Sequence, residues 1–204
     1  GHPGGHEYGG EGTGNRNAFS LSALSRPCGE PCGTVEVISR DLMTTNDLPQ
    51  KNLSIGEIYV TTKAEQVSTV LGSCVSVCLY DSKNKISGMN HHVLPAPPPS
   101  AQVDSKHSGK YGKTALPELL DRMKRLGMET RTTSAKIFGG AHMLSQISFA
   151  MINERNVAVA REFLHANGIR IVAEDVGGDR GRKVIFQTDS GKVLVREVNK
   201  REFL

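Results

Sequence analysis

Four short apolar segments follow one another closely between residues 55 and 95, and this density constrains the fold more than any other feature of the chain. The segments are IGEIYVTT, QVSTVLG, CVSVCLYD and KISGMNHHVLP. Gly56, Gly72 and residues 81–85 carry the turn signals among them. Four strands within about forty residues leave room only for short connections, so we predict an antiparallel sheet.

The segment CVSVCLYD alternates side chains between two faces of its predicted strand. One face carries Val75, Val77 and Leu79, and the other carries Cys74, Ser76, Cys78 and Tyr80. This pattern predicts a strand that is covered on both faces, as in the middle of a layered fold.

Helices and further strands follow this region. TALPELLDRMKRLGM has apolar residues at helical spacing, which predicts a helix that has Pro117 in its first turn and ends at Gly127. NERNVAVAREFLHANG predicts a second helix, capped by Asn153 and ended by Gly168. Strands are predicted at TVEVI, AKIFGGA, IRIVAEDV, RKVIFQT and KVLVREV. About eight or nine strands with two main helices predict an α+β fold, in which the helices are layered on mostly antiparallel sheets.

The length of 204 residues predicts one domain that carries a tail. Residues 1–33 contain nine glycines and little aliphatic periodicity, so we predict a disordered tail, in which residues 1–4 could be the scar of an expression tag. Residues 34–204 are predicted to form a single domain. Within it, Ala96–Lys110 is rich in proline and serine and is predicted to be a mobile surface loop.

Charge and hydropathy exclude several classes of protein. Lys and Arg number 25 against 21 for Asp and Glu, and a net charge of +4 is too small to demand a nucleic-acid or membrane partner. No run of about 18 apolar residues occurs, and no positively charged segment leads into an apolar one at the start of the sequence. We therefore expect neither a transmembrane helix nor a signal peptide.

The four cysteines form two pairs, Cys28 with Cys32 and Cys74 with Cys78. Residues four apart in a strand lie about 13 Å from each other at roughly 3.3 Å per residue, too far for two zinc–sulfur bonds of about 2.3 Å. A zinc site is therefore disfavoured, and Cys78 is predicted to be a small buried hydrophobic residue.

Cys74 differs because LGSC places Gly72 and Ser73 directly before it, where a turn passes into a strand. Backbone N–H groups at such a turn could point toward an oxyanion. A thiol needs a base to become a good nucleophile, and His91 and His92 lie in a neighbouring predicted strand. Alternation allows only one of them to face Cys74. From spacing alone, such a pair is more often part of a core than catalytic.

Several segments in this order resemble the chemoreceptor glutamine deamidase family, CheD. They are LGSCVSVCLYD, GMNHHVLP, KIFGGA, NERNV and EDVGGDRGRKVIF, and the similarity covers residues 53–198. The resemblance implies a cytoplasmic hydrolase of chemotaxis, which converts selected glutamines of methyl-accepting chemoreceptors to glutamates. It also implies a layered fold like that of the toxin deamidases.

The resemblance assigns roles to individual residues. Cys74 matches the family's cysteine nucleophile, and His91 matches its histidine. The family's third residue, a threonine, falls at Ser68, with Thr69 directly after it. The implied mechanism passes through a thioester, with the oxyanion held by backbone N–H groups near Ser73 and Cys74, and it needs no metal or organic cofactor.

The partners that the resemblance implies are the cytoplasmic helices of chemoreceptors and, in some members, a CheC-type phosphatase. The alternative is therefore a non-catalytic binding module that regulates such a phosphatase or the receptor. No nucleic acid or membrane insertion is expected. Arg180 and Arg182 lie in GGDRGRK, which we predict to be a hairpin-like, solvated turn, although the arginines could meet acidic receptor helices. KIFGGA has no Lys-Ser/Thr ending, which favours close backbone packing against the site over phosphate binding.

Overall fold

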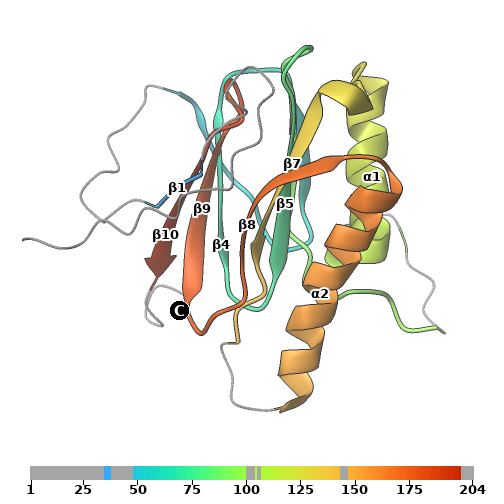
Figure 1. Ribbon diagram of the computed structural model, residues 1–204, viewed down its shortest axis with the longest axis vertical. Coiled ribbons are helices and arrows are strands. Elements are labelled where there is room, and N and C mark those ends of the chain that lie inside the picture. The colour runs from blue at the N-terminus through green and yellow to red at the C-terminus, as the bar shows by residue number, and fades with distance from the viewer. Residues whose placement is uncertain (1–34, 38–47, 100–103, 105–106, 143–146, 199–204) are drawn as a thin grey trace, which may run out of the picture. The chain divides into compact units, whose positions relative to one another are not determined.

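The computed structural model describes residues 35–37, 48–99, 104, 107–142 and 147–198 (Figure 1). The predicted tail, residues 1–33, lies outside these ranges, and so do Cys28 and Cys32. The described part is α+β with mostly antiparallel pairing, as predicted: five of its eight strand pairings are antiparallel.

The strands form two five-stranded sheets rather than one. The first sheet has the order β1 (Val35–Val37), β10 (Val193–Val198), β9 (Gly181–Gln187), β4 (Gln66–Leu71), β2 (Gln50–Asn52). The second sheet has the order β3 (Ile58–Thr61), β6 (Ile86–Asn90), β5 (Val75–Asp81), β7 (Thr133–Gly139), β8 (Arg170–Val176). Two helices, α1 (Gly112–Arg125) and α2 (Ile147–Ala166), lie beside the second sheet, on the side away from the first (Figure 1).

Two apolar cores hold these three layers together. The core between the second sheet and the helices includes Val75, Val77, Leu79, Leu119 and Leu164. The core between the two sheets includes Val67, Leu71, Cys78, Tyr80 and Phe186. The two faces of β5 therefore enter different cores, and every residue of this strand is buried. This confirms the prediction of a strand that is covered on both faces.

The prediction that the four segments between residues 55 and 95 form one antiparallel sheet is wrong. β4 pairs with β9 and β2 in the first sheet, whereas β5 pairs with β6 and β7 in the second. Residues 72–74 therefore carry the chain from one sheet to the other. The link from β8 to β9 also crosses between sheets, so GGDRG is not a hairpin. Alternation of apolar residues reports that a strand has a buried face, but not which sheet it joins.

The helix starts also differ from the prediction. α1 begins at Gly112, so Pro117 lies inside the helix rather than in its first turn, on the exposed side. α2 begins at Ile147, so Asn153 is not its cap; the Asn153 side chain is buried and donates from Nδ2 to Ala141 O at 2.9 Å. Asparagine is common at helix caps because it bonds backbone groups, and here it bonds the backbone of another element.

The loop predicted over Ala96–Lys110 is only partly described. Residues 100–103 and 105–106 lie outside the described ranges, and Ser108–Lys110 forms a short 3₁₀ helix. Gly109 in this helix is buried against Gly56, so the end of the segment is packed rather than exposed throughout. No helix in the described ranges is long and apolar enough to cross a bilayer.

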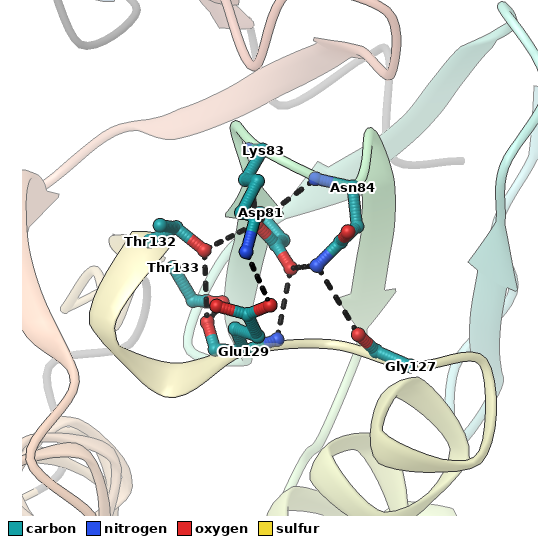
Figure 2. A network of polar contacts seen from close by, with 7 residues as sticks. All are labelled: Asp81, Lys83, Asn84, Gly127, Glu129, Thr132 and Thr133. Carbon is teal, nitrogen blue, oxygen red and sulfur yellow. Dashed lines mark hydrogen bonds and ion pairs between the residues drawn. The ribbon is translucent and has the colours of Figure 1, made fainter.

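A buried carboxylate fixes the end of β5 that lies away from residues 72–74 (Figure 2). Asp81 accepts hydrogen bonds from the amide of Lys83, from the amide and side chain of Asn84, from the amide of Glu129 and from Thr132 Oγ1. Burial raises the pKa of Asp81, but these hydrogen bonds outweigh it and hold the pKa below its ordinary value. The carboxylate thus ties the turn after β5 to the segment that enters β7.

Candidate active site

The structure brings Thr69, not Ser68, to the imidazole of His91. Thr69 Oγ1 lies 2.8 Å from His91 Nδ1. Ser68 lies on the opposite face of β4, where its hydroxyl donates to Asn52 Oδ1 at 2.7 Å. Alternation along the strand explains this difference. Thr69 is two residues after Val67 and shares its face, and Val67 is buried between the two sheets.

The hydrogen bonds of Thr69 determine the tautomer of His91. The Thr69 hydroxyl has one proton, and Oγ1 donates it to Leu53 O at 2.8 Å. The contact with His91 Nδ1 therefore requires Nδ1 to be the donor, which leaves the lone pair on Nε2. His91 Nε2 is buried and has no hydrogen-bond partner in the described part of the chain. A free basic nitrogen is thus held in a fixed orientation.

His91 and Cys74 lie on the same face of the second sheet. Val75 and His92 exchange backbone hydrogen bonds of 3.0 and 2.9 Å, so they are directly opposite each other. Each preceding residue then points to the other face, toward the first sheet. Cys74 packs against the core between the sheets, and His91 reaches Thr69 there. The register therefore places the candidate base and the candidate nucleophile diagonally across two neighbouring chain segments.

Both groups are uncharged at neutral pH. Burial lowers the pKa of His91 to about 4. Burial raises the pKa of the Cys74 thiol, and hydrogen bonds from the Ser73 side chain and from the amide of Cys74 itself offset only part of this rise. A neutral thiol and a neutral imidazole require proton transfer at the moment of attack, which is the work of a general base.

The carbonyl groups of the turn at residues 72–74 are hydrogen-bonded, whereas the amide of Cys74 contacts only its own thiol in the described ranges. Gly72 O accepts from the amide of Ala141 and Cys74 O from the amide of Gly140, both at 2.8 Å. In the described ranges, no oxygen accepts a hydrogen bond from the amides of Ser73 and Cys74. The resemblance implies backbone N–H groups near Ser73 and Cys74 at an oxyanion, and the lack of an oxygen acceptor for these two amides is compatible with that role.

Gly139 and Gly140 of KIFGGA pack against this turn. Gly139 has a φ of 109°, and a Cβ placed on it would lie 2.1 Å from Cys74 O. Only glycine permits this approach of β7 to the turn. The expectation that KIFGGA packs its backbone closely against the site is thereby confirmed.

Cys78 and His92 have the same residue types as the candidate pair, but both are buried in the core. Cys78 is buried, and burial raises its pKa to about 12. His92 is also fully buried, with Nδ1 2.9 Å from Asn90 Nδ2 and Nε2 3.4 Å from Asn156 O. It lies on the helix side of the sheet, away from the face of Cys74, as the alternation predicts.

The arginines of GGDRGRK are not both solvated, so this prediction needs correction. Arg182 is buried in β9 and pairs with Asp175 Oδ1 at 2.6 Å while also donating to the carbonyls of Asp175 and Gly177. Arg180 is exposed and pairs with Glu197 at 2.6 Å. Arg182 therefore braces the crossing between the sheets and is not free to contact another protein.

An open depression of about 730 Å³ lies between α2 and β8 and contains none of the candidate site residues. Arg161 and Glu174, which line it, form a two-pronged ion pair of 2.9 and 2.7 Å. The candidate chemistry is thus separate from this depression.

Acidification is expected to destabilise the fold through the two buried histidines. An unfolded histidine binds a proton near its ordinary pKa of 6.5, whereas burial lowers the pKa of both His91 and His92 to about 4. The unfolded state therefore binds more protons between these values. The contribution of these histidines to the free energy of unfolding is fully present above about pH 6.5. It is lost as the pH falls toward 4, by up to about 1.4 kcal/mol per pH unit for each histidine.

Urea unfolding at several pH values measures this slope. In His92→Gln the slope should be shallower by about 1.4 kcal/mol per pH unit, because one titrating group is gone. Parallel curves for wild type and variant over this range would contradict the assignment of His92 as a buried neutral histidine.

Comparison with known proteins gives consistent matches. The family model described as "CheD chemotactic sensory transduction" matches residues 93–197. Three proteins named "Probable chemoreceptor glutamine deamidase CheD" are similar over most of their length. The one from Sulfurimonas denitrificans is 40% identical over 76% of this chain and 97% of its own length. The one from Rhodospirillum rubrum is 44% identical over 75% and 85%, and the one from Methanococcus maripaludis is 40% identical over 71% and 93%.

These matches differ in what they cover. The family model begins after His91, so it does not include His91, the candidate residues of β4 or the turn at residues 72–74. The aligned stretch of 156 residues with the Sulfurimonas protein is long enough that, within 204 residues, it necessarily includes residues 69–91.

Proposed function

Because this chain belongs to the CheD family, we propose that it is a protein-glutamine deamidase, which hydrolyses the side-chain amides of selected chemoreceptor glutamines to glutamates. The relatives carry the name chemoreceptor glutamine deamidase. The main chemical support is the contact of Thr69 with His91 Nδ1. It leaves Nε2 of the imidazole without a partner in the described part of the chain, and His91 lies on the same face of the sheet as Cys74.

In the first half of the reaction, His91 Nε2 takes the proton of the Cys74 thiol while the sulfur attacks Cδ of the glutamine. The electron pair of the C=O bond moves to the oxygen, and the amides of Ser73 and Cys74 donate to this oxyanion. When the C=O bond re-forms, the C–N bond breaks, and His91 gives its proton to the departing ammonia. The glutamine carbon is then held as a thioester on Cys74.

In the second half, water opens the thioester. His91 Nε2 removes a proton from the water, whose oxygen attacks the thioester carbon. The S–C bond breaks and the sulfur regains its proton from His91. The net change is one water consumed and one ammonia released for each glutamine converted to glutamate. No step requires a metal or organic cofactor.

The substrate defines where the protein would act. Glutamines on the cytoplasmic helices of chemoreceptors place the reaction in the cytoplasm. A CheC-type phosphatase is a further proposed partner, and control of that phosphatase without catalysis is the alternative function. Cells that carry Cys74→Ala and retain full chemotactic signalling would favour the alternative.

The proposed activity is tested on the cytoplasmic fragment of a methyl-accepting chemoreceptor. We expect the wild-type protein to raise the mass of individual glutamines by about one dalton and to release one ammonia for each. Site-resolved mass spectrometry with an ammonia assay measures both. A fragment whose glutamines keep their mass under conditions where the protein is folded would contradict the proposal.

Thr69→Val is expected to lower kcat for deamidation by about 10²-fold, because the imidazole loses the acceptor that holds Nδ1 protonated. Valine keeps the shape of threonine, so the fold should be retained. Ser68→Ala is the matched control: it removes the neighbouring hydroxyl, which bonds Asn52 rather than His91, and it should leave kcat within about twofold. Steady-state kinetics with the receptor fragment measure both variants. Equal losses in the two would contradict the role of Thr69.

A further inference from the structure

Asn156 joins the two chain segments that carry the proposed nucleophile and base. Its side chain is fully buried on α2. Nδ2 donates to Val93 O at 2.7 Å, two residues after His91, and lies 3.4 Å from Ser73 O, directly before Cys74. A single side-chain amide of α2 thus contacts both segments from the helix side of the second sheet.

The contact with Ser73 O bears on the amide of Cys74. The carbonyl of Ser73 and the N–H of Cys74 belong to one rigid peptide unit and point in opposite directions. Holding the oxygen toward α2 therefore directs the N–H away from α2. The neighbouring carbonyls of Gly72 and Cys74 are held by backbone amides of residues 140 and 141. Within the described ranges, the carbonyl of Ser73 is the one of the three that a side chain holds.

We propose that Asn156 is a positioning residue, which orients the Ser73–Cys74 peptide so that the amide of Cys74 points at the oxyanion of the tetrahedral intermediate. This inference rests on the proposed function, because it assumes attack by Cys74 on a carbonyl carbon. In the described ranges the hydrogen bonds of Asn156 Nδ2 go to backbone carbonyls and not to the thiol, and the proposed role requires no contact with the substrate. This role predicts that loss of the side chain slows only the reactions in which an oxyanion forms.

Two reactions of the same thiol separate this role from a structural one. Iodoacetamide alkylates sulfur by displacing iodide, and no oxyanion forms. p-Nitrophenyl acetate acylates sulfur: the carbonyl electron pair moves to oxygen, returns, and expels p-nitrophenolate, which leaves a thioester. Both reactions need the thiol and its base, but only the second needs the oxyanion donors. A loosened core would slow or speed both together.

The experiment uses the full chain as wild type, Asn156→Ala, Asn153→Ala and Cys74→Ala. Asn153 is the matched control, because it is also buried on α2 and also donates to a carbonyl, that of Ala141, but not to the Ser73–Cys74 peptide. Rates in Cys74→Ala are subtracted, so that the remaining thiols do not contribute. We expect Asn156→Ala to keep the alkylation rate within about twofold and to lower the acylation rate at least about tenfold, with Asn153→Ala changing the ratio of the two rates by less than about threefold.

Asn156→Leu is a second variant, which keeps the test possible if Asn156→Ala does not fold. Leucine has the same number of side-chain heavy atoms, and it removes Oδ1, which is buried without a partner in the described part of the chain. It should show the same split between the two reactions. Equal losses in both reactions, unchanged acylation, or failure of both variants to fold would overturn the proposal. Acylation that Cys74→Ala leaves unchanged would instead refute the proposed nucleophile, which makes the two failures distinguishable.

Discussion

Cys74→Ala is expected to lower kcat for deamidation by at least about 10⁴-fold, because the thioester forms on the sulfur of Cys74 and only binding and the oxyanion donors remain without it. The variant should keep its fold, since alanine removes only one sulfur atom from a residue that is partly exposed. The rate of ammonia release from the receptor fragment measures the loss.

Cys78→Ala is the matched control for this result. Cys78 lies four residues along the same chain segment, but it is buried, and burial raises the pKa of its thiol to about 12. Its substitution should cost about 1 kcal/mol of stability, from a small cavity, and leave kcat nearly unchanged. A Cys78→Ala variant as inactive as Cys74→Ala, at equal folded fraction, would contradict the assignment of the nucleophile.

Gly139→Ala is expected to cause the largest loss of stability among single substitutions near the site, about 4 kcal/mol or more. Two costs combine here. The φ of 109° is unfavourable for any residue with a Cβ, and that Cβ would lie 2.1 Å from Cys74 O and 3.2 Å from Val75 Cα. These neighbours are backbone atoms, so the turn at residues 72–74 must move to make room for the Cβ. Activity of the fraction that folds should fall as well.

Gly127→Ala separates the two costs. Gly127 has a similar φ of 93°, but no atom lies within 4 Å of the Cβ position. Its loss should be about 1–2 kcal/mol, the cost of the backbone conformation alone. Urea unfolding of both variants gives the difference. Losses of equal size would show that β7 does not press against the turn as the structure has it.

Much of the fold could be predicted because strand patterns are local. The alternation in CVSVCLYD predicts two buried faces, and Val77 and Cys78 do enter different cores. The division into two sheets could not be predicted, because the turn of residues 72–74 has the composition of a hairpin and the pairing depends on distant strands such as β9. The start of α2 could not be predicted for a related reason: asparagine is a common helix cap, but the side chain of Asn153 bonds Ala141, which lies outside the helix.

The candidate site could be predicted in part. The resemblance implies Cys74 and His91 as the pair, and alternation along a strand allows only one of His91 and His92 to face Cys74. The choice between Ser68 and Thr69 needs the face of β4 that meets the second sheet, and this depends on packing between the sheets. Asn156 carried no signal as a site residue, because its role comes from the position of α2 behind the turn.

The most direct test of deamidation by Cys74 is to incubate the chemoreceptor fragment with the protein in water enriched in oxygen-18. We predict that wild type converts individual glutamines to glutamates that are about three daltons heavier, because hydrolysis of the thioester adds one oxygen from water, and that Cys74→Ala does not. No modification by wild type, or the same modification with Cys74→Ala, would contradict it.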